Sequence, residues 1–513
     1  MYRSLCLFAV LVSSSAGAAP PDLADHHLNV LPRTQAETAR IDAATARATD
    51  FTTPEAFEAN QGGAATVRAR SDADAFSQSS ANISFEGELN FKLGNGLFRK
   101  LWVSSPSSTL ASDGLGPLFN ARSCQRCHLK DGRGHPPEAS DDSRVSMFLR
   151  LSVPAAPQDE MTEIERYLAA LDGQVDRTRP DPMLGGQLQD LALPGHAPEG
   201  QMHIDYEEIA VDLSGGDTVS LRRPTYRVAG PGYGALRHDL QLSPRVAPPM
   251  IGLGLIEAIP ASDILRAEDP DDTDGDGISG RAQIVWSTEF DQPMLGRFGW
   301  KAGMPTVREQ SAAAFSGDIG ISTPLFPAAA GDCTQGQSAC LDAPHGDGDA
   351  RGTEIDSEGL DLVTFYSRNL AVPARRNPDD PQVLRGKQVF YETGCTACHT
   401  PKFVTHRLDD DSPQSFQLIW PYSDLLLHDM GDGLADDRPE GRANGREWRT
   451  PPLWGIGLTR QVNGHDYYLH DGRARSLLEA ILWHGGEAEP AKARVVQMPP
   501  ADRAALIEFL ESL

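Results

Sequence analysis

Two copies of one short pattern, Cys-x-x-Cys-His, constrain this chain more than any other feature of its sequence. The copies comprise Cys124, Cys127 and His128 in the first and Cys395, Cys398 and His399 in the second. The two-residue gap lets both thiols reach one edge of a porphyrin and form thioethers with its vinyl groups, while the adjoining imidazole becomes an axial ligand of the iron. The pattern therefore predicts two covalently bound c-type hemes.

Two other kinds of site use paired cysteines. One is a thioredoxin-like redox pair, and the other is a four-cysteine zinc site assembled from both pairs. Neither accounts for the histidine that follows the second cysteine in both copies. A thioredoxin-like fold also requires a β-α-β context, and the sequence shows none around either copy. We therefore interpret both copies as heme attachment sites.

Residues 1–19 have the pattern of a secretory signal peptide. Arg3 supplies the positive start, residues 5–12 form an apolar run, and Ala16-Gly17-Ala18 is a cleavage site of small residues. The run is too short to span a bilayer, and no later stretch approaches the roughly 20 apolar residues of a membrane-spanning helix. We expect an exported, periplasmic protein with no integral membrane segment.

Cys333 and Cys340 remain once the four motif cysteines and Cys6, which lies in the signal peptide, are set aside. In an oxidising compartment the default for such a pair is a local disulfide. Two free thiols on a loop are the alternative.

The formal net charge of −26 is unusual for a chain with 40% hydrophobic and 23% charged residues. Phosphate groups would be repelled, so neither nucleic acid nor an anionic membrane is expected as a partner. The charge permits steering of a basic redox protein, although a solvated acidic surface explains it equally well.

The chain repeats more than its cysteine pattern. Residues 247–255 and 450–458 are similar Pro-Pro-containing strings, and each follows its own heme motif, which favours an internal duplication over a chance match. We predict a mainly α fold with two cytochrome c-like heme domains, a small β insertion and long irregular loops. The expected parts are a signal peptide (1–19), a polar, extended or loosely packed N-terminal arm (20–80) with one helix near residues 35–48, an N-terminal heme domain (81–322) with a β insertion at about 201–228, a linker (323–356) and a C-terminal heme domain (357–513).

Acidic residues alternate in a short loop as they do at the start of an EF-hand calcium site. The three are Asp272, Asp274 and Asp276. Gln283 stands at the twelfth position, where a bidentate Glu would complete the site. Ca²⁺ binding and a plain acidic turn both remain open.

From about Asn82 to its end the chain resembles the bacterial di-heme oxidoreductase family, which belongs to the wider group of di-heme cytochrome c peroxidases. The resemblance rests on residues 114–121, 276–281, 298–302, 427–431 and 470–474. It implies an electron-transfer heme in the C-terminal half and a reactive heme in the N-terminal half. A small redox protein or another donor would supply electrons, and peroxide or another small oxidant would receive them.

The resemblance also implies roles for single residues. His484 matches the second axial ligand of the C-terminal heme, with a helix-surface histidine as the alternative. Trp300 matches a tryptophan between the hemes, or is an ordinary buried indole. The family's usual catalytic Glu has no clean match, and the candidates are Asp318 and Gln310. His135 and Met147 are candidates for the sixth position of the N-terminal iron.

We therefore expect a periplasmic di-heme c-type oxidoreductase that passes electrons from the C-terminal heme to the N-terminal heme, with peroxide as a candidate oxidant. The alternative is a non-catalytic di-heme electron carrier that serves a partner protein, for example in iron handling. A role in thiol chemistry has no support, because the sequence offers no reactive cysteine.

Overall fold

The computed structural model describes residues 23–137, 146–346, 352–410 and 412–513. The expected signal peptide, residues 1–19, lies outside the described residues. Among the described residues, no helix is both long enough and apolar enough to cross a lipid bilayer.

The prediction of a mainly α fold is wrong. The chain is 31% helical and 17% strand, and its strands form small antiparallel sheets. Five of these sheets pair strands of two to four residues, some from neighbouring and some from distant segments, because irregular backbone must still pair its N–H and C=O groups. These pairs are β1 (Val30–Leu31) with β12 (Arg407–Leu408), β2 (Leu118–Phe119) with β5 (Leu191–Ala192), β9 (Ile284–Ser287) with β10 (Gln292–Leu295), β11 (Phe403–Val404) with β13 (Leu418–Ile419), and β14 (Leu427–Asp429) with β15 (Glu447–Arg449).

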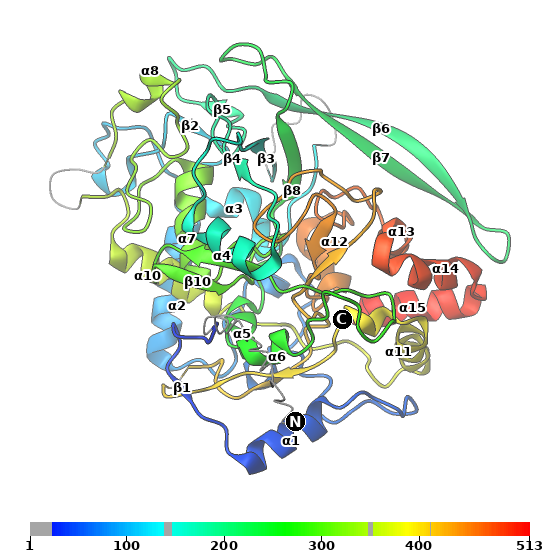
Figure 1. Cartoon of the computed structure of the whole chain (residues 1–513). Helices are drawn as coiled ribbons and strands as arrows, with labels where there is room; N and C mark the ends of the chain where they lie inside the picture. Colours follow the sequence, from blue (N-terminus) through cyan, green and yellow to red (C-terminus); the bar gives the residue numbers. More distant parts are fainter. Residues whose placement is uncertain (1–22, 138–145, 347–351, 411) are drawn as a thin grey trace, which may run out of the picture.

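Two helix pairs of the same construction lie on opposite sides of the molecule (Figure 1). Helix α2 (Phe85–Phe98) crosses α10 (Ser357–Arg368), and α11 (Pro381–Thr393) crosses α15 (Pro500–Ser512). Each crossing has a glycine where the backbones meet. A Cβ atom on Gly94 would collide with the Leu362 carbonyl, and one on Gly386 with the Ala505 carbonyl. Only glycine allows this close approach.

The two Pro-Pro strings also adopt one conformation. Gly252 and Gly455 have φ of 72° and 73°, and their N–H groups donate to the carbonyls of Leu370 (2.9 Å) and Leu513 (3.0 Å). These acceptors follow α10 and α15 at the end of each helix pair. The shared geometry favours duplication over a chance match of short strings.

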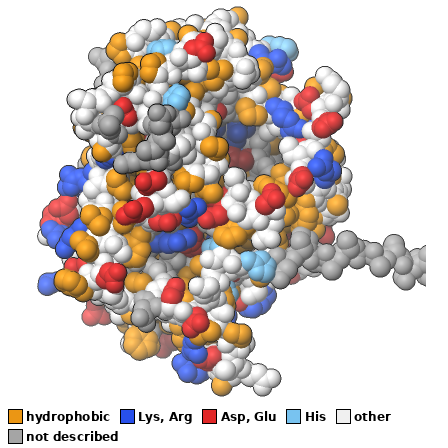
Figure 2. Space-filling model, turned by 90° about the vertical axis from the view of Figure 1, so that its left-hand side faces the viewer, with side chains coloured by type: hydrophobic (Ala, Val, Ile, Leu, Met, Phe, Trp, Pro, Cys, Tyr) orange, Lys and Arg blue, Asp and Glu red, His pale blue; other side chains and the backbone are white. Residues whose placement is uncertain are grey.

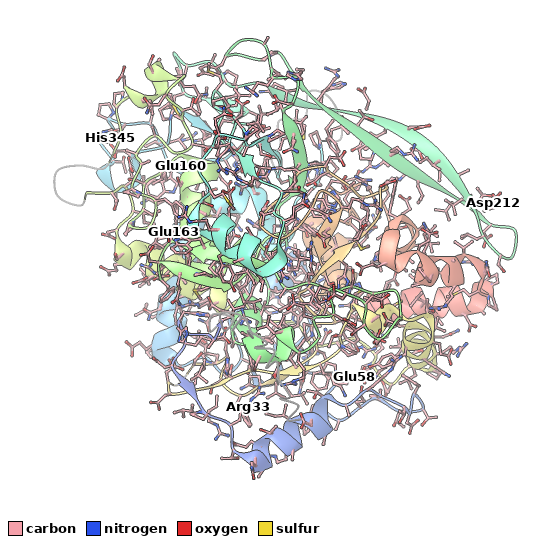
Figure 3. The ribbon with its side chains drawn as sticks, in the orientation of Figure 1. Arg33, Glu58, Glu160, Glu163, Asp212 and His345 are labelled. Carbon is pink, nitrogen blue, oxygen red and sulfur yellow. A yellow bond between two sulfur atoms is a disulfide. The ribbon has the colours of Figure 1, made fainter. Side chains whose placement is uncertain are left out.

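The predicted β insertion is a long hairpin of β6 (Gln201–Asp212) and β7 (Thr218–Ala229). It extends across α13 (Leu477–Trp483) and α14 (Glu489–Gln497) in Figure 1, and Asp212 lies near its tip in Figure 3. The Tyr226 hydroxyl donates to Asp471 at 2.7 Å, and the Ser214 N–H donates to the Val496 carbonyl at 2.9 Å. The insertion thus ties the N-terminal half to the C-terminal half.

The N-terminal arm is extended but anchored. It contains the predicted helix as α1 (Gln35–Thr45). Asp25 is buried between Arg297 (2.5 Å) and His406 (2.7 Å). Burial alone would raise the pKa of Asp25, but the charge of Arg297 and the hydrogen bonds from His406 and the Ala261 N–H together outweigh burial, and the pKa falls to about 2. Arg33 and Glu58 mark the course of the arm in Figure 3.

The segment expected to be a linker covers the N-terminal half. The predicted disulfide between Cys333 and Cys340 is confirmed, and it encloses most of the short helix α8 (Ser338–Leu341). Asp332 beside it accepts hydrogen bonds from the N–H groups of Gly186 (2.7 Å) and Gln187 (3.0 Å). Because segments of each half pack into the other, the domain boundaries stay a prediction.

The remaining sheet, β4 (Thr178–Arg179), β3 (Met147–Pro154) and β8 (Gln241–Val246), forms one wall of the interior. The remaining described helices of four residues or more are α3 (Cys124–Cys127), α4 (Glu163–Asp172), α5 (Leu253–Glu257), α6 (Ala261–Leu265), α7 (Val307–Ala314) with the π-helical turn η5 (Phe315–Ile319), α12 (Thr459–Asn463) and the 3₁₀ turn η2 (Ala73–Phe76). In Figure 2 acidic and basic side chains are interspersed, so the acidic excess is not gathered in one area of that face.

Candidate functional site

One interior cavity of about 700 Å³ joins the two Cys-x-x-Cys-His motifs. Its lining includes Cys124, Cys127 and His128 from the first motif and Cys395, Cys398 and His399 from the second. Among the described residues, no metal-sized cluster combines cysteines of both motifs. The four-cysteine zinc site is therefore not assembled in the described part of the chain.

Both motif histidines are held in the same way. Nδ1 of His128 lies 2.8 Å from the Pro248 carbonyl, and Nδ1 of His399 lies 2.8 Å from the Tyr422 carbonyl. A carbonyl only accepts, so Nδ1 carries the hydrogen and Nε2 keeps a free lone pair, as a metal ligand requires. Burial lowers the pKa of each histidine to about 4, which keeps both rings neutral at pH 7.

His484 has the same arrangement at the end of α13. Its Nδ1 lies 2.8 Å from the Ala480 carbonyl, and the residue lines the cavity. Burial is the main cause that lowers the pKa of His399, and the charge of His484 lowers it further. The two rings therefore lie in the same part of the cavity. The geometry suits the ligand role predicted for His484, which stays a prediction.

The two candidates for the sixth position of the N-terminal iron lie elsewhere. Neither His135 nor Met147 is among the residues that line the cavity. His135 packs against the ring of His465 at 5.1 Å, and Met147 is buried in the core beside Val246.

Helix α7 and the turn η5 form a wall beside the first motif. The residues of this wall that line the cavity are Val307, Gln310, Ser311, Ala314, Asp318 and Ile319. Burial, and to a lesser extent the negative charge of Asp318, raises the pKa of Cys124 to about 12. Asp318 therefore lies close to this motif. Burial also raises the pKa of Asp318, which favours its protonated form. The structure thus brings Gln310 and Asp318 together with the first motif, while their catalytic role stays a prediction.

Trp300 belongs to an aromatic group in the same cavity that the sequence did not predict as a unit. Its Nε1 donates to the Val246 carbonyl at 2.8 Å, and its ring centroid lies 6.5 Å from that of His470. The His470 ring stacks on Trp448 with centroids 3.7 Å apart. His470 lies in a segment that carried the family resemblance, but no sequence signal paired it with Trp448.

Basic residues outnumber acidic residues on the cavity wall, whereas the chain as a whole is acidic. The lining basic residues are Arg133, Arg150, Arg245, Arg297, Arg438, Arg449, Lys492 and Arg494, and the lining acidic residues are Asp276, Asp318, Glu440 and Glu487. The buried Nε of Arg133 has no hydrogen-bond partner among the described residues. Heme propionates are carboxylates and would match such a wall. The donor set and the charge therefore fit two hemes.

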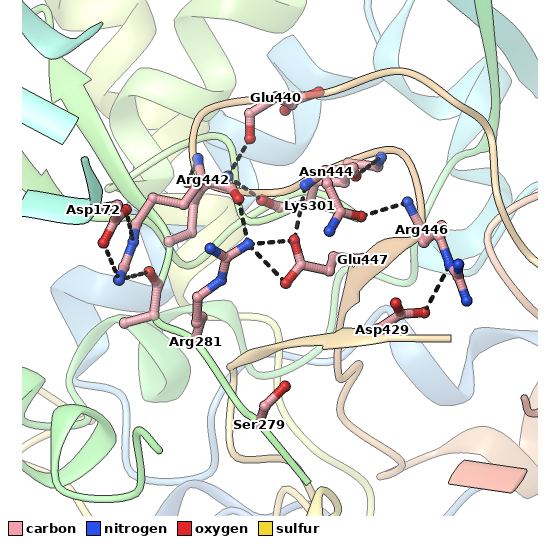
Figure 4. Close-up of polar contacts among 12 residues, drawn as sticks. Asp172, Ser279, Arg281, Lys301, Asp429, Glu440, Arg442, Asn444, Arg446 and Glu447 are labelled. Carbon is pink, nitrogen blue, oxygen red and sulfur yellow. Dashed lines mark hydrogen bonds and ion pairs between the residues drawn. The ribbon is translucent and has the colours of Figure 1, made fainter. Parts of the chain in front are cut away.

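A long loop between β14 and β15 brings Arg438 and Glu440 from the C-terminal half to this wall. Glu440 and Asn444 of this loop are labelled in Figure 4, together with Lys301. Lys301, which is fully buried, holds the loop. Its Nζ donates to the carboxylate of Asp436 (2.8 Å) and to the carbonyls of Arg438 (2.8 Å) and Asn444 (2.9 Å). All three ammonium donors are therefore used.

Substituting Lys301→Met is expected to lower the free energy of unfolding by about 3 to 5 kcal/mol, because it leaves the buried charge of Asp436 without its partner. Urea unfolding of the purified protein measures this. The double variant Lys301→Met with Asp436→Asn removes both charges and should recover part of the loss. Equal stability of wild type and Lys301→Met would show that the loop is held otherwise.

The acidic loop differs from the predicted set. The carboxylates that gather are those of Asp269, Asp272 and Asp274, while Asp276 lines the interior cavity. Gln283, at the twelfth position, uses its Nε2 on the carbonyls of Lys301 (3.0 Å) and Glu440 (2.7 Å). Gln283 therefore does not close an EF-hand loop, and Ca²⁺ binding stays untested.

His428 is a further buried residue at the second motif that sequence reasoning missed. Its Nε2 lies 2.9 Å from Asp424 and its Nδ1 lies 2.8 Å from Glu487, while the Cys398 sulfur is 3.6 Å away. Its carboxylate partners are 4 and 59 residues away in sequence, so only folding reveals the group.

Glu199 is a buried acid behind η5. It accepts hydrogen bonds from the Gln189 N–H (2.7 Å) and the Gln337 Nε2 (2.6 Å), and the Gln189 side chain donates to the Gly317 carbonyl (2.8 Å). Burial raises the pKa of Glu199 to about 8.

The folded protein therefore binds more protons at Glu199 than the unfolded chain between about pH 4.5 and pH 8. Across this window the free energy of unfolding is expected to fall as pH rises. The full loss is about 1.4 kcal/mol for each pH unit by which the folded pKa exceeds the unfolded pKa. Glu199→Gln should flatten this slope. Urea unfolding at pH 5, 6.5 and 8 tests this, with the exposed Glu160→Gln as control. Parallel slopes in wild type and Glu199→Gln would contradict it.

Comparison with known proteins gives one family. A family model described as "Di-haem oxidoreductase, putative peroxidase" matches residues 56–513. No curated protein matches the chain. Among solved structures, a Kuenenia stuttgartiensis hydrazine synthase pressurized with xenon is 18% identical with a TM-score of 0.22, over 37% of this chain and 65% of that one. At this TM-score the likeness carries no argument.

Proposed function

Since this chain belongs to the di-heme oxidoreductase family, we propose that it is a periplasmic enzyme with two covalently attached c-type hemes that reduces a small oxidant such as peroxide. A redox protein would supply electrons at the C-terminal heme, and the oxidant would react at the N-terminal heme. The periplasmic location rests on the signal pattern of residues 1–19. The covalent attachment rests on the two Cys-x-x-Cys-His motifs.

The observation that carries the proposal is the difference between the two ends of the cavity. At the second motif His484 approaches His399 with Nε2 free. At the first motif the wall of α7 and η5 presents Gln310, Ala314 and Asp318, none of which bears an imidazole or a thioether. The thioethers of Met250 and Met304 line the cavity elsewhere, outside this wall. One end is therefore suited to a closed electron-transfer site and the other to a site that admits a small molecule.

When bound, heme supplies a one-electron redox centre whose iron can accept a small ligand. Reduction of hydrogen peroxide to two molecules of water consumes two electrons and two protons. Asp318 is the candidate proton donor, because burial raises its pKa and the residue lines the cavity beside the first motif. The Gln310 amide can orient the oxidant by hydrogen bonds. Trp300, His470 and Trp448 supply aromatic contacts for electron passage within the cavity.

Stopped-flow mixing of the half-reduced, heme-loaded protein with hydrogen peroxide tests the proposal. Asp318→Asn is expected to slow the peroxide reaction about 10²- to 10⁴-fold, the range for loss of a general acid. Arg308→Gln is the matched control, because Arg308 lies on the same helix and pairs with Glu289 and Asp361. Its rate should equal that of wild type.

Two results would argue against the proposal. If both irons of the wild type are permanently low spin and ignore peroxide, the protein is an electron carrier for a partner. If Asp318→Asn reacts at the wild-type rate, Asp318 is not the proton donor.

A further inference from the structure

Strands β3 and β8 turn a row of basic side chains toward the cavity. Phe148 pairs with Arg245 and Arg150 pairs with Ser243 across this antiparallel ladder. Because side chains alternate along a strand, Phe148, Arg150 and Arg245 share the face that lines the cavity, whereas Leu149 packs into the core. Arg438, from the loop between β14 and β15, joins them.

Two of these arginines, Arg245 and Arg438, share one carboxylate. Glu440 pairs with Arg245 at 2.7 Å and with Arg438 at 2.7 Å. Burial alone would raise the pKa of Glu440, but the charges of Arg245 and Arg438 hold it well below its usual range. The charge of Arg150 also acts on Glu440 and on Arg438, so the four groups form one cluster.

Part of the cluster's hydrogen-bonding capacity is unused. No hydrogen bond or ion pair joins the Arg150 guanidinium to any described residue. Its central carbon lies over the Phe148 ring, 5.3 Å from the ring centroid. The buried Nε of Arg438 likewise has no partner in the described ranges. Asp318 and Asp332 are the other carboxyls near Arg150, and neither forms an ion pair with it among the described residues.

An excess of partly buried positive charge is unfavourable unless an anion balances it. The planar guanidinium group binds planar oxyanions through paired N–H donors. We propose that Arg150, Arg245 and Arg438 form an oxyanion-binding site beside the N-terminal heme motif. Its place next to the reacting centre rests on the proposed function, whereas anion binding itself does not. The oxyanion is either a small free one, as substrate or effector, or a propionate of the heme.

Calorimetric titration of the ferric, heme-loaded full-length protein with sodium nitrate tests the site. Nitrate is planar, carries one charge and is a poor ligand for iron. Wild type should bind it saturably at one site per chain. Arg150→Gln should weaken binding about tenfold, the effect of losing one charge-assisted hydrogen bond. This substitution leaves no carboxylate unpaired, so the fold should persist.

Two further variants complete the design. Glu440→Gln removes the competing negative charge and should tighten nitrate binding several-fold. Arg227→Gln is the control for loss of an arginine from a strand outside the cavity, because Arg227 lies on β7 and pairs loosely with Asp205 at 3.6 Å. Its affinity should equal that of wild type.

A spectroscopic redox titration identifies the source of the oxyanion. If nitrate does not bind, but Arg150→Gln lowers the midpoint potential of one heme and Arg227→Gln does not, the propionate occupies the site. If nitrate does not bind and no potential moves, the arginines are structural and the inference is overturned. Since no peroxide is used, nitrate binding by a protein inert to peroxide would reject the proposed function and leave the anion site standing.

Discussion

Substituting both Cys124→Ala and Cys127→Ala is expected to reduce the covalently bound heme from two groups per chain to one. The two thiols are the atoms that would form thioethers at the first motif. Without them, His128 offers only a coordinate bond, which is lost when the protein is denatured. Intact mass under denaturing conditions and the pyridine hemochrome assay both report the number of retained hemes.

The matched control is Cys333→Ala with Cys340→Ala. These cysteines form a disulfide outside the cavity, so both hemes should be retained. Removing the disulfide, which closes a short loop, should lower the unfolding free energy by about 2 to 3 kcal/mol. A wild-type mass without two added macrocycles would contradict heme attachment, and so would two retained groups after loss of Cys124 and Cys127.

The Cys124/Cys127 variant should also be less stable than the control. The cavity wall near the first motif includes Phe98, Met250 and Val363, which lose a packing surface when heme is absent. Arginines that would face propionates, such as Arg133, would then keep a buried N–H group without a hydrogen-bond partner. Thermal unfolding followed by circular dichroism separates the two variants. The expected order of melting temperature is wild type, then the disulfide variant, then Cys124→Ala with Cys127→Ala.

Local sequence patterns predicted the parts of the molecule that close over short distances. The heme motifs span five residues each, the disulfide spans seven, and the hairpin at 201–228 shows alternation around a Ser-Gly-Gly-Asp turn. In each case the interacting residues are neighbours in the chain. Such patterns carry their own geometry, which explains why these predictions needed no tertiary information.

The prediction of the fold class was wrong because many of the strands pair with segments that are distant in the chain. Val30 pairs with Leu408 and Leu118 pairs with Ala192, in strands of two residues that are too short to show alternation. Alternation becomes visible only over longer segments, so the sequence predicted the hairpin at 201–228 and overlooked these short strands.

The sequence predicted the motif cysteines and histidines of the candidate site, but not the charged residues that gather around the site. Arg438 and Glu440 are about 290 residues from Arg150, and Lys301 pairs with Asp436 across 135 residues. No sequence period joins such positions. The acidic loop shows the same limit, since Asp269 replaces Asp276 in the observed cluster because of the way the loop turns.

The second large effect is expected at His484. With Nδ1 held by the Ala480 carbonyl, the Nε2 of His484 would be free to serve as a second ligand of the C-terminal heme iron, together with His399. A ferric heme with two imidazole ligands is low spin. Substituting His484→Gly should therefore convert one of the two hemes to high spin. Electron paramagnetic resonance and the optical charge-transfer band of the ferric protein measure this change.

Added imidazole distinguishes loss of the ligand from damage to the fold. In His484→Gly the vacated space should accept imidazole and restore the low-spin spectrum, which a misfolded helix α13 would not do. His465→Gly is the control, because His465 packs against His135 outside the cavity and should leave both hemes unchanged. If His484→Gly retains the wild-type spectrum, His484 only ends its helix, and the C-terminal iron takes its second ligand from another residue. The two ends of the cavity would then no longer differ in the way that assigns electron entry to one and oxidant binding to the other.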